Sequence, residues 1–95
     1  MELDEEFYTT RDLTMAATLV CLHFPLEGYE VQYEGIRPKP RFYFKFTQSV
    51  GLDKAINKIL NKDTAVEPYT FWGNIRMLKS LMDNDKNRPD RAEMV

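Results

Sequence analysis

Two stretches of alternating apolar and polar residues predict a pair of β-strands. Successive side chains point to opposite faces of a strand, so the alternation in residues 41–47 gives one apolar and one polar face. Residues 29–34 alternate in the same way, and the six-residue segment 35–40 holds the glycine and prolines of a turn. The apolar face of the second strand consists of Phe42, Phe44 and Phe46. We therefore expect an antiparallel hairpin.

One alignment of the two strands agrees on both faces. It places apolar residues opposite each other on one side and opposite charges on the other, an arrangement that stabilises cross-strand pairs. The predicted pairs are Glu34 with Arg41, Tyr33 with Phe42, Val31 with Phe44, Glu30 with Lys45 and Tyr29 with Phe46. In this alignment Arg41 and Lys45 have partners inside the protein.

Three further stretches repeat apolar residues at helical spacing. The first begins at Thr9, which can cap the helix while Asp12 completes a capping box, and it runs to about Leu22. The second covers residues 52–61, and the third begins at Pro68 because proline suits the first turn of a helix. The residues expected to face inward are Leu52, Ala55, Ile56, Ile59 and Leu60 on the second helix and Phe71, Trp72, Ile75, Leu78, Leu81 and Met82 on the third.

These elements predict an α+β fold, with a helix, an antiparallel β-hairpin and then two helices packed on one face of a small sheet. The chain has 95 residues, 43% of them hydrophobic, which suits one domain with a single core. We expect this domain to cover residues 7–83, between an acidic N-terminal arm at 1–6 and a mobile charged tail at 84–95. Residues 64–66 are expected to add a short edge strand.

The chain carries features of a cytoplasmic protein. Four of its first six residues are acidic, whereas a signal peptide begins with basic residues followed by an apolar run. The most apolar run, residues 15–26, is shorter than the roughly 20 residues that cross a bilayer. The single cysteine, Cys21, fits a reducing compartment. We expect a cytoplasmic protein without membrane association.

The residue types of enzyme active sites are sparse. Cys21 and His23 are two positions apart, so on a helix their side chains point about 200° away from each other and cannot form a catalytic pair locally. A zinc site needs more ligands than one cysteine and one histidine. The four glycines form no phosphate-binding loop. We expect no catalytic residues, no metal and no cofactor, and therefore no enzyme activity.

The net charge of −2 hides an uneven distribution. Residues 1–35 contain eight acidic residues and one basic residue. Residues 36–62 contain seven basic residues and one acidic residue. Such asymmetry indicates a charged partner.

The basic middle of the chain supplies a candidate nucleic-acid interface. Two bases project from the proline-containing turn, three lysines recur four residues apart along the second helix, and a tyrosine on the polar strand face can stack on an unpaired base. These candidate residues are Arg37, Lys39, Tyr43, Lys54, Lys58 and Lys62.

A protein partner is the alternative. The acidic arm or the exposed edge of the hairpin can serve an inhibitor or adaptor, and the acidic first third of the chain repels nucleic acid overall. The oligomeric state is open, and a homo-oligomer is one option.

The sequence also resembles a family of small proteins without an assigned activity, encoded by bacteriophages and bacterial mobile elements. The residues that carry this resemblance are Phe7 to Leu13 with Ala16, Ala17 and Leu19, then Phe42, Tyr43 and Phe44, and then Pro68, Phe71, Leu78 and Lys79. The resemblance spans about residues 7–81 and implies a viral or mobile-element origin. Small proteins of that origin often bind nucleic acid or inhibit a host protein.

Overall fold

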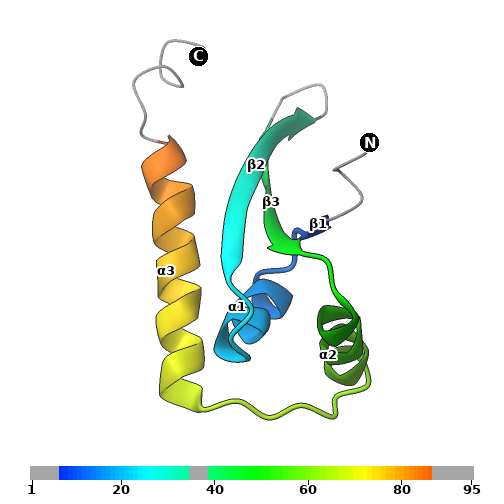
Figure 1. Cartoon of the computed structure of the whole chain (residues 1–95). Helices are drawn as coiled ribbons and strands as arrows, with labels where there is room; N and C mark the ends of the chain where they lie inside the picture. Colours follow the sequence, from blue (N-terminus) through cyan, green and yellow to red (C-terminus); the bar gives the residue numbers. More distant parts are fainter. Residues whose placement is uncertain (1–6, 35–38, 87–95) are drawn as a thin grey trace.

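The computed structural model describes residues 7–34 and 39–86, which form three strands and three helices (Figure 1). The predicted acidic arm at 1–6, most of the predicted turn and the end of the predicted tail lie outside the described residues. In chain order the elements are β1 (Phe7–Thr10), α1 (Leu13–Cys21), β2 (Leu26–Glu34), β3 (Lys39–Thr47), α2 (Val50–Leu60) and α3 (Pro68–Lys86). The α+β fold is confirmed.

The described strands form one antiparallel sheet in the order β1-β3-β2, so β3 is the central strand. Its buried face carries the three phenylalanines expected from the alternation. They join a core to which α1 contributes the largest share, and α1 contacts both α2 and α3. The core residues are Met15, Ala16, Ala17, Leu19, Phe42, Phe44, Phe46, Leu52, Ile75 and Leu78. The first helix therefore has a central position in the core.

The register of the hairpin differs by two residues from the predicted one. Val31 lies opposite Phe42 and Glu30 lies opposite Tyr43. The shift arises because the strand begins at Lys39, inside the predicted turn, where a proline near the start of a strand is tolerated. A shift by an even number of residues returns each side chain to the same face, so the apolar and polar faces are as predicted.

The register shift changes the cross-strand neighbours of the charged residues on the polar face. The Lys45 Nζ lies 3.6 Å from the Glu30 Oε2, although Lys45 is now a diagonal neighbour of Glu30. The predicted position of Glu34 directly opposite Arg41 is wrong, because Glu34 lies opposite Lys39 and Arg41 lies opposite Gln32. The polar face therefore contains the predicted Lys45–Glu30 ion pair, although the direct cross-strand neighbours of both residues differ from the predicted ones.

The start of the first helix is also corrected. Thr9 belongs to strand β1, opposite Lys45, and does not cap α1. The N-cap is Asp12, whose Oδ1 accepts hydrogen bonds from the backbone N–H groups of Thr14 (2.9 Å) and Met15 (3.2 Å). The residues that fit the capping-box spacing belong in part to a short strand. Pairing of that strand with β3 places Tyr8 against the core.

This cap leads to a testable expectation. Asp12→Ala should lower the free energy of unfolding by about 1 kcal/mol, because two N–H groups of the first turn lose their acceptor. Thr9→Ala should change it by less than about 0.5 kcal/mol, because Thr9 is an exposed strand residue. Urea unfolding of the two variants compares them directly. A larger loss for Thr9→Ala would restore the predicted cap.

The third helix begins as predicted and ends later. The Glu67 carboxylate accepts hydrogen bonds from the Thr70 hydroxyl (2.7 Å) and from the backbone N–H groups of Thr70 (2.7 Å) and Tyr69 (3.1 Å). These bonds, led by the one from the Thr70 hydroxyl, hold the pKa of Glu67 below its usual value. At the other end α3 continues past residue 83, and Asp85, assigned to the mobile tail, is 2% exposed and accepts a hydrogen bond from the Tyr29 hydroxyl at 3.4 Å.

Three other expectations are wrong. Trp72 and Leu60 are 57% and 65% exposed, although both were expected to face inward. Each follows directly after an inward-facing residue, and one step along a helix turns the side chain by about 100°. Residues 64–66 form no strand, and β1 supplies the third strand of the described sheet instead.

Candidate functional site

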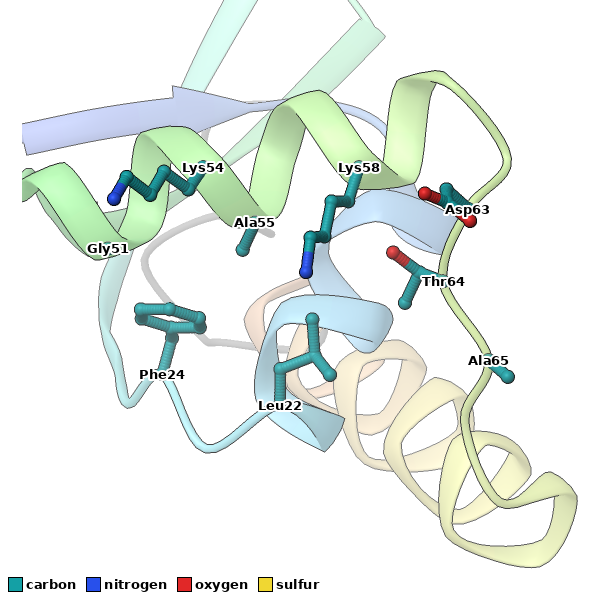
Figure 2. Close-up of a pocket in the computed structure, with 9 residues that line it drawn as sticks. All are labelled: Leu22, Phe24, Gly51, Lys54, Ala55, Lys58, Asp63, Thr64 and Ala65. Carbon is teal, nitrogen blue, oxygen red and sulfur yellow. The ribbon is translucent and has the colours of Figure 1, made fainter.

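A cavity of about 450 Å³ lies between the C-terminal end of α1, one side of α2 and the segment that leads to α3 (Figure 2). Its walls combine apolar side chains with two lysines, a carboxylate and a hydroxyl. The lining residues are Leu22, Phe24, Gly51, Lys54, Ala55, Lys58, Asp63, Thr64 and Ala65. The cavity brings together parts of the chain that are far apart in sequence.

The floor of the cavity is positioned by the way α1 ends. The N–H of His23 bonds to the carbonyl of Val20 (2.9 Å), and the N–H of Phe24 bonds to the carbonyl of Leu19 (3.0 Å). This is a Schellman motif, in which the residue after the C-cap adopts a left-handed conformation. His23 has that conformation, with a φ of 73°. The reversal directs Leu22 and Phe24 toward α2 instead of continuing the helix.

The far wall is built by the same device at the end of α2. The N–H of Lys62 bonds to the carbonyl of Ile59 (3.0 Å), and the N–H of Asp63 bonds to the carbonyl of Lys58 (2.8 Å). Lys62 has a φ of 59°. This second Schellman motif turns the chain back, so that Asp63, Thr64 and Ala65 close one end of the cavity.

Because the backbone of His23 has a left-handed conformation, we expect one substitution at this position to increase the stability of the protein. His23→Gly should raise the free energy of unfolding by about 0.5–1 kcal/mol, because glycine adopts a left-handed conformation without the strain that a Cβ causes. Thermal unfolding of the variant measures the change. A loss of stability would instead mean that the imidazole makes a stabilising contact.

The two lysines at the cavity come from successive turns of α2. Lys54 and Lys58 are four residues apart, which corresponds to a rise of about 6 Å along the helix axis. Both side chains are exposed. In Figure 2 the Lys58 side chain extends into the hollow toward Leu22, and the Lys54 side chain runs along the rim on the side of Phe24. Within the described residues, neither ammonium group takes part in an ion pair.

The cavity therefore has a cationic mouth and an apolar interior. Ala55 lies between the two lysines and leaves room beneath them because its side chain is a single methyl group (Figure 2). Asp63 and Thr64 provide polar groups at the end opposite Lys54. Such a site suits a ligand that is flat and apolar on one part and anionic on another.

The structure separates the six residues predicted to contact nucleic acid. Lys54 and Lys58 lie on one side of α2, as their spacing predicted, and both line the cavity. Lys62 is exposed but lies beyond the end of α2 and does not line the cavity. Tyr43 is half-buried on the polar face of β3. Arg37 lies outside the described residues, and Lys39 begins β3, where its side chain is not described.

Several cavity residues were missed by the sequence reasoning. Leu22 was expected at the end of the first helix and Phe24 beyond that end, and residues 64–66 were expected to form an edge strand. The usual signal is absent at these helix ends, because His23 and Lys62 stand where a glycine or asparagine usually takes the left-handed conformation.

Comparisons with known proteins give no match. No protein-family model matches the sequence, and neither the curated proteins nor the solved structures include a match. The origin in a bacteriophage or mobile element stays a prediction. In the described part of the chain, no helix is long and apolar enough to cross a membrane. Residues 7–34 and 39–86 contain no group of three or more His, Cys, Asp or Glu side chains arranged to hold a metal ion.

Proposed function

We propose that the protein is a non-enzymatic accessory protein of a bacteriophage or mobile element, and that it contacts nucleic acid through Lys54 and Lys58. The observation that supports the contact is the pair of exposed ammonium groups on successive turns of α2, at the mouth of one cavity. An ammonium group binds phosphate as a compact charge, and each contact releases a counterion from the nucleic acid. The origin is supported by the family resemblance of the sequence.

The overall negative charge does not prevent this contact. Electrostatic interactions between exposed groups are screened beyond about 10 Å at 0.1 M salt, so the local charges around α2 decide the encounter. Asp53, the acidic residue in the first turn of α2, accepts a hydrogen bond from the Gln48 side chain. Lys62 adds a third base just beyond the helix, and Tyr43 is proposed as a separate contact on the open strand face.

The salt dependence of binding tests the proposal. Binding of a labelled DNA strand is measured by fluorescence anisotropy from about 50 to 200 mM salt. On a single strand each lost phosphate contact flattens the slope of log K against log salt by about 0.7, so Lys54→Ala with Lys58→Ala should flatten it by about 1.4. The control is Lys79→Ala, an exposed lysine of α3. Absence of binding at about 50 mM salt, where phosphate contacts are strongest, would overturn the proposal.

One observation favours a protein partner as the second candidate. Tyr69 and Trp72, in the first two turns of α3, are 86% and 57% exposed, and Arg76 is exposed one turn further on. Tyrosine, tryptophan and arginine are the residues that most often dominate the binding energy of protein interfaces. Under this alternative, capture of a host protein survives nuclease treatment, is lost with Trp72→Ala and persists with Lys54→Ala and Lys58→Ala.

A further inference from the structure

The interior of the cavity indicates which form of nucleic acid the site takes, and this inference rests on the proposed function. Lysines alone do not distinguish a duplex from a single strand, because phosphates are present on both. The groups beneath the lysines do distinguish them. They are apolar and form a hollow whose volume, about 450 Å³, lies within the range of small-molecule sites.

The lining of the hollow suits an aromatic ring. Phe24 is half-buried and lies on the floor, and Leu22 lies beside it, below Lys58 (Figure 2). Nucleobases stack on phenylalanine rings whatever the base, since every base has a π-face. Ala55 and Ala65 provide further apolar wall without filling the space. An aromatic ring with room above it is a stacking surface for a base.

A duplex cannot use this surface. Its bases are stacked and paired in the interior of the helix, so the phosphates of a duplex can reach Lys54 and Lys58 while no base reaches the floor. In a single strand the bases are free to turn away from the backbone. We propose that the cavity binds one unpaired base of a single strand, with Phe24 as its stacking surface and Lys54 and Lys58 holding the adjacent phosphates.

The polar end of the cavity adds a preference among the bases. The Asp63 carboxylate accepts hydrogen bonds and cannot donate them, so it favours a base with an exocyclic amino group, such as cytosine or adenine. Thr64 can donate or accept and does not discriminate. Thymine has no exocyclic amino group, and its single ring N–H lies between two carbonyl oxygens that the carboxylate repels, so thymine is disfavoured. The negative charge of Asp63 also keeps the phosphates at the lysine side of the mouth.

The test compares four labelled oligonucleotides of one length: a cytosine-rich strand, the same strand with abasic sites, a thymine strand, and the cytosine-rich duplex. At one salt concentration the wild-type protein should bind the cytosine-rich strand about tenfold more tightly than the abasic strand or the duplex. Phe24→Leu keeps an apolar side chain but removes the ring. It should lose about tenfold on the cytosine-rich strand and little on the duplex, without a change in salt slope.

Two further measurements keep the inference separate from the proposed function. Asp63→Asn should reduce the preference for cytosine over thymine by strengthening thymine binding, because an amide can donate a hydrogen bond to a thymine carbonyl oxygen. In the methyl-labelled protein, deoxycytidine monophosphate should shift the resonances of Ala55 and Ala65, whereas inorganic phosphate should not. Unfolding curves establish that each variant is folded.

The possible outcomes distinguish a failure of the base-binding inference from a failure of the proposed phosphate contact. Equal binding of all four oligonucleotides, with Phe24→Leu unchanged but Lys54→Ala and Lys58→Ala weakened, would overturn the base-binding cavity and retain the phosphate contact. Absence of binding to every oligonucleotide at about 50 mM salt would overturn both. Tight single-strand binding that the Phe24 and Asp63 variants both retain would place the base elsewhere and overturn the inference.

Discussion

Phe44→Ala is expected to lower the free energy of unfolding by about 3–5 kcal/mol, the range for truncating a buried phenylalanine. The Phe44 side chain is 1% exposed at the middle of the central strand, and its ring centroid lies 6.5 Å from that of Tyr29. Truncation removes apolar contacts and leaves a cavity that the surrounding core fills incompletely. The loss approaches the total stability of a small domain, so urea unfolding should show a protein that is mostly unfolded or close to it.

The matched control is the next residue on the same strand. Lys45→Ala should cost less than about 1 kcal/mol, because Lys45 lies on the polar face and makes surface contacts alone, to Glu30 at 3.6 Å and over the Phe7 ring at 5.1 Å. Equal losses for Phe44→Ala and Lys45→Ala would mean that the two faces of the sheet have been assigned the wrong way round.

Leu78→Ala is expected to have the second largest effect, a loss of about 2–5 kcal/mol. Leu78 is 0% exposed and belongs to the core cluster in which α3 packs against α1. The long helix has many exposed residues, so its position depends on a few buried ones, Leu78 and Ile75 foremost. Urea unfolding followed by far-ultraviolet circular dichroism measures the loss.

The control for Leu78 is its neighbour on the helix. Lys79 is exposed, and alanine has a high helix propensity, so Lys79→Ala should change stability by less than about 0.5 kcal/mol. If Leu78→Ala were as mild as Lys79→Ala, α3 would not be packed against α1 as the structure describes.

The sheet shows which features the sequence reveals. The buried face of β3 was predictable, because alternation over seven residues leaves Phe42, Phe44 and Phe46 on one side whatever strand lies next to them. The register was not predictable, because an even shift satisfies the same faces. Strand β1 was missed since it has four residues, and its threonines and the following aspartate also fit a helix cap.

The cavity likewise has features that the sequence predicts and features that it does not. The i, i+4 spacing of Lys54 and Lys58 predicted that these side chains share one side of α2. It also predicted Lys62 on the same row, but the helix ends at Leu60 and Lys62 takes a left-handed conformation. The position of Phe24 beneath the lysines depends on how α1 packs against α2, a tertiary contact that local spacing does not contain. Helix ends, more than helix interiors, decided the shape of the site.

The exposed aromatic residues of α3 and the lysines of α2 indicate two different classes of partner. Tyr69 and Trp72 suit a protein surface, whereas Lys54 and Lys58 over an apolar cavity suit a nucleotide chain. A chain with both surfaces can also bring a protein to a nucleic acid. The two contacts are on different helices and can be removed separately by Trp72→Ala and by Lys54→Ala with Lys58→Ala.

The most direct measurement of the central claim is a map of backbone amide resonances during titration with a short cytosine-rich DNA strand. The phosphate contact at α2 and the base in the cavity predict the largest shifts within residues 22–24, 51–58 and 63–65, the segments that contain the cavity-lining residues. The same shifts should disappear with Lys54→Ala and Lys58→Ala. Shifts that instead concentrate at Tyr69 and Trp72, or on the polar face of β3, would contradict the claim.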